Sequence, residues 1–108
     1  MHDFVSLSLV EKFVPLMERQ HVSEVARSPR GFLTAYREAG GHKNRLGPEW
    51  VAKREAFIAR HMAQVIANDE RLFVDGMPTR RHLALLAWAY TPQLERIVRS
   101  SRQKPSRS

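Results

Sequence analysis

The sequence predicts an all-α fold: a compact single domain of four to five helices, followed by a short, flexible, basic tail. Apolar residues recur at helical spacing along most of the chain, and Ser/Thr-Pro pairs and glycines mark the helix ends. The 108 residues, 43% of them hydrophobic, suffice for one modest core. We therefore expect one helical domain over residues 1–99, with a charge-balanced part (1–40) and a basic part (41–99), and a tail over residues 100–108.

The first helix is predicted to begin at about residue 9. Ser8 and Glu11 have the spacing of a capping box, in which each side chain accepts a hydrogen bond from a backbone N–H group. Pro15 lies within this helix and removes one hydrogen bond, so we expect a kink or a restart there. A further helical turn is expected over residues 20–27. The apolar stripe of the first helix consists of Leu9, Val10, Phe13, Leu16 and Met17.

The second and third helices have clearer boundary signals. Ser28-Pro29 combines a favoured N-cap residue with a favoured first helical residue, and Gly40-Gly41 is a typical helix stop. A basic loop follows these two glycines. The longest helix is predicted over residues 48–68, because this stretch opens with proline and contains no further proline or glycine.

The last third of the chain predicts a short extended segment and two more helices. Residues 72–74 are apolar and precede an Asp-Gly pair that is typical of a turn. Thr79 is the expected N-cap of a helix over about residues 80–90. A Thr-Pro pair at residues 91–92 repeats the signal and begins the last helix. No apolar residue anchors the segment after residue 99, so we expect it to be flexible.

The positive charge is concentrated in the second part of the chain. Five basic residues balance five acidic residues in residues 1–40, so the whole formal net charge of +7 lies in residues 41–108. A basic, asymmetric charge distribution is typical of a surface that binds polyanions such as nucleic acids. The same composition is also common in basic proteins that bind no polyanion.

The long helix offers one candidate surface. Trp50 and Phe57 lie seven residues apart on the border of its apolar arc. Aromatic rings beside cations suit stacking on bases or sugars, while the cations hold phosphates. Alternatively, both rings widen the core contact and the arginine stems cover its rim. The polar residues beside the two rings are Lys53, Arg54, Arg60, His61 and Gln64.

The helix that follows Thr79 offers a second candidate, because Arg80, Arg81 and His82 occupy its first turn. The free N–H groups of a helix start and two guanidinium groups predict a phosphate site. In helix-turn-helix proteins the first residues of the recognition helix reach the bases, but here about ten residues separate the two helices, which departs from that motif. Alternatively, the turn is a solvated basic surface that pairs with Asp69, Glu70 or Asp75.

Together these candidates predict a nucleic-acid-binding surface that the basic loop and the basic C-terminal residues extend. DNA or RNA is the expected partner, held chiefly through its phosphate backbone. The predicted contact residues are Lys43, Arg45, Lys53, Arg54, Arg60, Arg80, Arg81, His82, Arg99 and Arg102.

Enzymatic activity is not expected. The five histidines lack metal-binding spacing, no glycine-rich phosphate loop or serine elbow is present, and there is no cysteine. We therefore expect neither a cofactor nor a metal ion. The alternative to nucleic-acid binding is a helical interaction or assembly module, such as an adaptor or a component of a larger particle, with a homo-oligomer formed through the apolar N-terminal helix.

Membrane association is not expected either. No apolar stretch approaches the roughly 18 residues that span a bilayer, and the N-terminus has no basic signal-peptide region. The expected location is the cytoplasm, or the host-cell interior for a viral protein.

Overall fold

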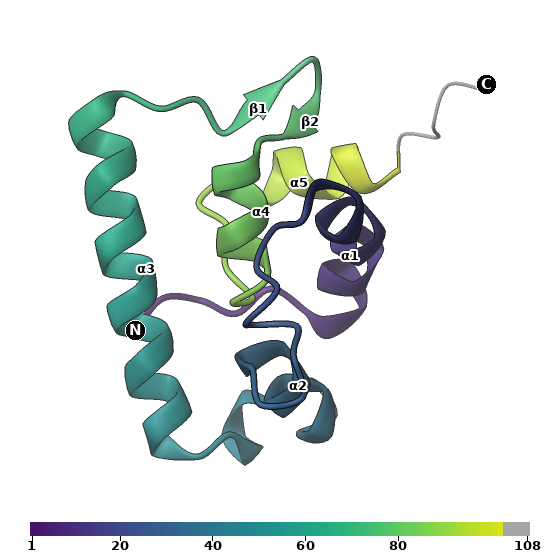
Figure 1. Cartoon of the computed structure of the whole chain (residues 1–108), viewed down its shortest axis with the longest axis vertical. Coiled ribbons are helices and arrows are strands. Elements are labelled where there is room, and N and C mark those ends of the chain that lie inside the picture. Colours follow the sequence, from purple (N-terminus) through teal and green to yellow (C-terminus); the bar gives the residue numbers. More distant parts are fainter. Residues whose placement is uncertain (103–108) are drawn as a thin grey trace.

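One short helix lies at the centre of the computed structural model, which describes residues 1–102 (Figure 1). This central helix, α4, has α3 on one side and α1 and α5 on the other, while α2 lies towards the end of the molecule where α3 begins. The arrangement confirms the predicted all-α single domain. The elements are α1 (Leu7–Gln20), α2 (Phe32–Glu38), the 3-10 helix η1 (Lys43–Arg45), α3 (Pro48–Asn68), β1 (Phe73–Val74), β2 (Met77–Pro78), α4 (Arg80–Leu86) and α5 (Leu94–Ser101).

Helix α1 begins two residues earlier than predicted. Ser6, rather than Ser8, is the N-cap, and its hydroxyl accepts a hydrogen bond from the N–H of Leu9 at 3.3 Å. The helix does not restart at Pro15 but continues to its left-handed C-cap, His21. Burial in the core anchors the helix on both sides of the proline, through Val10, Phe13 and Met17.

The segment between α1 and α2 consists of turns, so the predicted helical turn over residues 20–27 is wrong. His21 and Ser23 have left-handed φ angles of 55° and 58°, which interrupt right-handed helical geometry. Ser28 is not a helix cap, because its hydroxyl donates a hydrogen bond to the carbonyl of Val25 at 2.6 Å. Helix α2 therefore begins only after Gly31, three residues beyond the predicted N-cap.

A close backbone approach requires glycine at position 31. A Cβ atom there would lie 2.1 Å from the carbonyl oxygen of Val25 and 2.2 Å from that of Ala26. The Ala26 carbonyl also accepts a hydrogen bond from the N–H of Leu33 at 3.0 Å. The turn segment thus folds directly onto the first turn of α2.

Helix α3 and the hairpin confirm the predicted boundaries. Helix α3 covers residues 48–68 as expected and ends at Asp69, whose φ angle of 49° is left-handed. Strands β1 and β2 pair antiparallel, with Phe73 opposite Pro78. Their turn residues, Asp75 and Gly76, both have positive φ angles, which is the geometry of a two-residue type I′ hairpin.

The last two helices agree with the predictions in part. Thr79 caps α4 as expected, since its hydroxyl accepts a hydrogen bond from the N–H of His82 at 3.4 Å. Helix α4 stops well before residue 90, and Ala89 adopts a left-handed φ angle of 59°. Helix α5 begins after Gln93, not after Thr91, and its hydrogen-bonded turns extend through residue 101. The first two residues of the predicted tail are therefore helical, and residues 103–108 lie outside the described part of the chain.

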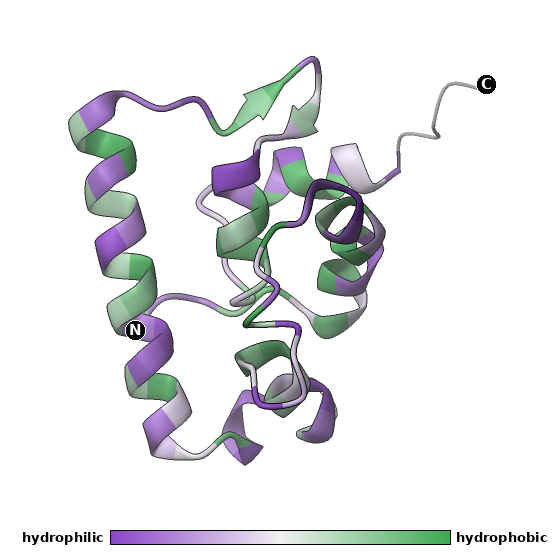
Figure 2. Cartoon of the chain, viewed as in Figure 1, coloured by the Kyte–Doolittle hydropathy of each residue, from purple (hydrophilic) through white to green (hydrophobic). Residues whose placement is uncertain are grey.

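The core lies between α1, α2, α4 and α5. In Figure 2 the apolar stretches of these helices face one another, whereas the first turn of α4 is hydrophilic. None of the described helices combines the length and the apolar character needed to cross a membrane. The largest fully buried apolar side chains are those of Tyr36, Phe32, Met17, Leu33, Ile58, Leu83, Leu85, Leu86 and Ile97.

Candidate functional site

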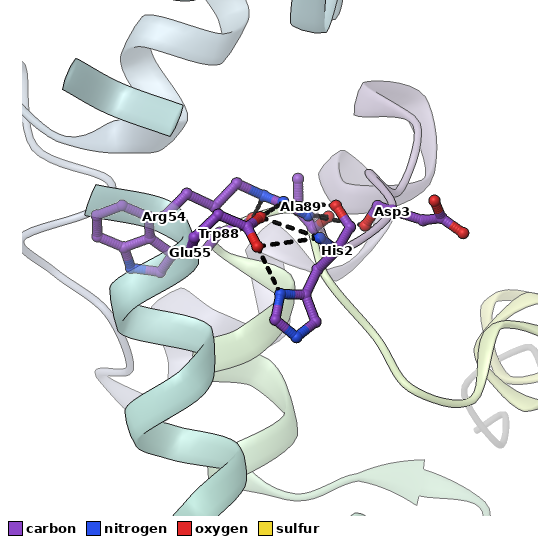
Figure 3. A network of polar contacts seen from close by, with 6 residues as sticks. All are labelled: His2, Asp3, Arg54, Glu55, Trp88 and Ala89. Carbon is purple, nitrogen blue, oxygen red and sulfur yellow. Dashed lines mark hydrogen bonds and ion pairs between the residues drawn. The ribbon is translucent and has the colours of Figure 1, made fainter. Parts of the chain in front are cut away.

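Arg54 does not lie on the surface, and its prediction as a nucleic-acid contact is wrong. The side chain is fully buried, and all five of its N–H bonds meet oxygen acceptors (Figure 3). Nε donates to the carbonyl of Trp88 at 2.8 Å. Nη1 and Nη2 donate to the carbonyls of His2 and Asp3 near the N-terminus, to the carbonyl of Ala89 and to the Glu55 carboxylate, at 2.7–2.9 Å.

This arginine joins three distant parts of the chain: α3, the N-terminal segment and the turn after α4. Its guanidinium group also lies 3.7 Å from the centre of the Phe4 ring. Burial lowers the pKa of Arg54, and the negative charge of Glu55 opposes that shift. Glu55 in turn accepts hydrogen bonds from the backbone N–H and the ring Nδ1 of His2. The network holds the fold together and leaves Arg54 no free donor for a phosphate.

His82 is also buried, and its prediction as a cationic contact is wrong. Its Nδ1 donates to the carbonyl of Leu72 at 2.9 Å, and its Nε2 lies 2.6 Å from the hydroxyl of Thr91. Burial lowers the pKa of His82 to about 4, so the ring is neutral at pH 7. A neutral Nε2 accepts the hydroxyl proton, and His82 thereby connects the start of the hairpin to the segment before α5.

The aromatic residues of α3 contact other aromatic rings. Phe57 stacks on Trp88, with ring centres 4.7 Å apart, and on His61 at 4.0 Å. Trp88 also stacks on Phe32 at 4.9 Å, and Trp50 meets Phe32 edge to face. These rings form a column from the core towards the surface, as the alternative of a widened core contact predicts. The column does not leave Phe57 as an open platform for bases.

A polar hollow of about 450 Å³ brings together the start of α4, the middle of α3 and the turns after α1. We call it the arginine hollow. Arg80 and Arg81, two of the predicted contact residues, line it, and His61 contributes from α3. Its full lining is His21, Val22, Ser23, His61, Glu70, Arg80, Arg81 and Ala84.

Arg81 forms more hydrogen bonds than Arg80, the other arginine of the hollow. Its Nε and Nη2 donate to the two carboxylate oxygens of Glu70, at 2.8 and 3.0 Å. Its Nη1 donates to Nδ1 of His61 at 2.7 Å. These hydrogen bonds lower the pKa of Glu70, which stays ionised near neutral pH. The predicted alternative, a basic turn paired with a nearby acid, thus describes Arg81.

His61 is surrounded by positive charge. Partial burial and the charges of Arg81 and Arg60 lower its pKa. A guanidinium group can only donate hydrogen bonds, so Nδ1 of His61 must accept and the ring proton resides on Nε2. Arg80 has no acidic partner among residues 1–102 and donates to the carbonyl of Gln20 at the end of α1.

The other predicted contact residues do not join the arginine hollow, except that Arg60 lies next to His61. Lys43 and Arg45 are exposed on η1, and the ammonium group of Lys53 lies 5.1 Å from the centre of the Trp50 ring. Arg99 and Arg102 line a hollow of about 410 Å³ on α5. The predicted surface is therefore several separate basic areas, and the arginine hollow and the hollow on α5 each contain two arginines.

Sequence reasoning missed His21 and Ser23 as site residues, because nothing local indicates that the turns after α1 face α4. Glu70 was foreseen only as a possible partner of the basic turn. No three metal-ligating side chains gather anywhere in the described residues. No protein-family model, curated protein or solved structure matches the chain, so the roles of these residues rest on geometry alone.

Proposed function

We propose that this protein binds nucleic acid through the phosphate backbone, with the arginine hollow as its main contact. The observation that carries this proposal is the convergence of Arg80 and Arg81 on one hollow that contains a single acid, Glu70. Guanidinium groups bind phosphate oxygens through paired, charge-assisted hydrogen bonds.

The placement of the aromatic rings favours backbone contacts over base stacking. Proteins that bind single strands commonly stack bases on exposed aromatic side chains. Here Phe57 stacks on Trp88 and His61, and Trp88 stacks on Phe32. We therefore expect a duplex to bind at least as well as a single strand of the same sequence, with little dependence on sequence.

The test compares two double variants that remove the same charge. Arg80→Ala with Arg81→Ala empties the arginine hollow of its cations. Lys12→Ala with Arg30→Ala removes two exposed basic residues that form no ion pair among the described residues and lie outside the hollow. Binding to duplex DNA, single-stranded DNA and RNA is measured by fluorescence anisotropy at low salt, and folding is checked by circular dichroism.

We expect the hollow variant to lose about tenfold or more in affinity and the control variant to lose much less, since only the first loses direct phosphate contacts. Equal losses in the two variants would show that only overall charge matters. The proposal fails if the wild-type protein binds none of the three nucleic acids at low salt.

Assembly through the N-terminal helix has less structural support. The apolar stripe that motivated it faces the chain's own core, since Val10, Phe13 and Met17 are buried in it. That stripe is not available to a second copy unless the domain opens. We therefore do not put assembly forward as a second function.

A further inference from the structure

The Glu70 carboxylate occupies the edge of Arg81 that a phosphate would use. Nε and Nη2 of a guanidinium group form a planar fork that pairs with two oxygens of either a carboxylate or a phosphate. In the arginine hollow this fork holds both oxygens of Glu70, at 2.8 and 3.0 Å. The position of the carboxylate thus marks where two phosphate oxygens would lie.

We infer that the arginine hollow is an exchange site, in which one phosphate group of the ligand displaces the Glu70 carboxylate from Arg81. Glu70 then serves as an internal counter-ion that keeps the site occupied until a phosphate arrives. This inference rests on the proposed function. It adds a specific binding position for one phosphate group and identifies the Glu70 carboxylate as its competitor within the chain.

The contact between Arg81 and Glu70 is suited to exchange. Both side chains are partly exposed, with 22% and 27% of their surface accessible, and water weakens ion pairs at such sites. Glu70 follows the C-cap of α3, and its carboxylate meets no other cationic side chain within hydrogen-bond distance in the described part of the chain. It can therefore turn away from Arg81 without disturbing the core.

Other polar groups around the hollow are ready to bind a phosphate. The hydroxyl of Ser23 and the Nε2–H of His61 form no hydrogen bond with any residue between positions 1 and 102. Arg80 adds a second positive charge that pairs with no acid among residues 1–102. A phosphate has more oxygens and more charge than the carboxylate it replaces, so it can contact these groups and Arg81 at once.

The first test is Glu70→Gln, with Asp69→Asn as the matched control. Both variants remove one negative charge at adjacent positions, but only Glu70 contacts Arg81. The glutamine can still accept one hydrogen bond, which protects the fold. We measure affinity for inorganic phosphate and for duplex DNA at constant ionic strength.

We expect Glu70→Gln to strengthen binding of both probes by about threefold to fivefold, because the competing carboxylate is gone, and Asp69→Asn to change it less than twofold. A gain for inorganic phosphate alone would identify the free ion, rather than the backbone, as the ligand of the seat. Equal effects of the two variants on both probes would overturn the exchange. In that case the proposed function would still stand if loss of Arg80 and Arg81 weakened duplex binding.

His61 provides a local readout of the same exchange. The charged groups around it are Arg60 on its own helix, Arg81 and Arg80 on α4, and Glu70 after α3; the titratable ring of His21 also lines the hollow. A bound phosphate would offset the guanidinium charges and raise the pKa of His61, as followed by NMR titration. We expect this rise with phosphate but not with chloride at equal ionic strength, and equal pKa values in the two salts would contradict a seat at this position.

Discussion

Arg54 shows that the charge of a single side chain does not reveal whether it binds a ligand or stabilises the fold. In the sequence it resembles its neighbours Lys53 and Arg60, but five oxygen acceptors surround its guanidinium group. Four of them are backbone carbonyls 34 to 52 residues away along the chain. Local sequence patterns do not indicate partners so far away along the chain. The sequence therefore could not distinguish this structural arginine from one that binds a ligand.

We predict that Arg54→Lys destabilises the protein by about 3 kcal/mol or more, because lysine keeps the charge but supplies three donors in place of five. The matched control is Arg60→Lys, the same change at an exposed position of the same helix, which should cost at most about 0.5 kcal/mol. Urea denaturation measures both. Similar unfolding free energies for the two variants would contradict the role given to Arg54.

His82 is a second residue whose buried environment contradicts the prediction from the sequence, which made it a cationic contact. Its folded pKa of about 4 lies below the ordinary value of 6.5, so between these values the unfolded chain binds a proton that the native protein does not. The free energy of unfolding therefore falls as the pH falls from about 6.5 to 4. The loss amounts to about 1.4 kcal/mol per pH unit over most of that range.

We predict that His82→Gln removes this contribution to the pH dependence, although the variant is less stable at neutral pH. Urea unfolding at several pH values between 4 and 7 measures the slope for the wild-type protein and the variant. Glu55 and Glu70, whose folded pKa values are lowered, lose their stabilising contributions at lower pH in both proteins and cancel in the comparison. Identical slopes would show that His82 does not govern this range.

At the level of the elements, the sequence predicted best those boundaries that local chemistry decides. Helix α3, the type I′ turn and the cap at Thr79 each depend on residues within a few positions, and each is confirmed. The predicted start of α1 was wrong because two nearby serines, Ser6 and Ser8, are both suitable N-caps. The predicted start of α2 was wrong because a tertiary contact at Gly31 determines it. A tight approach between backbone segments leaves no trace in a local pattern.

The glycine before α2 gives a direct test of that contact. We predict that Gly31→Ala destabilises the protein by about 2 kcal/mol or more, since its Cβ would overlap two carbonyl oxygens and the backbone would have to move. Gly47→Ala is the control: no atom lies within 4 Å of a Cβ there, and the φ angle of −66° suits alanine. The control should cost at most about 1 kcal/mol in thermal unfolding, because Gly47 is the N-cap of α3, where alanine is less favourable than glycine. Equal melting temperatures for the two variants would contradict the close approach.

At the level of the whole molecule, the fold divides the basic residues of the second part of the chain into two kinds. Arg54 and His82 belong to the interior, whereas Arg80 and Arg81 line the arginine hollow and the other predicted contact residues are exposed elsewhere. The sequence correctly placed Arg80 and Arg81 in the first turn of α4, because the cap at Thr79 fixes that helix start. It could not identify the turns after α1 as the opposite wall, since that depends on how α1 and α4 pack.

The most direct test of phosphate-backbone binding is the salt dependence of duplex affinity for the wild-type protein and the two double variants. Each phosphate contact contributes about 0.9 to the slope of log affinity against log salt concentration. We predict that Arg80→Ala with Arg81→Ala reduces this slope by about two contacts and lowers affinity, whereas Lys12→Ala with Arg30→Ala leaves the slope nearly unchanged. Equal slopes for the wild-type protein and the hollow variant, with both proteins folded, would contradict a phosphate contact in the arginine hollow.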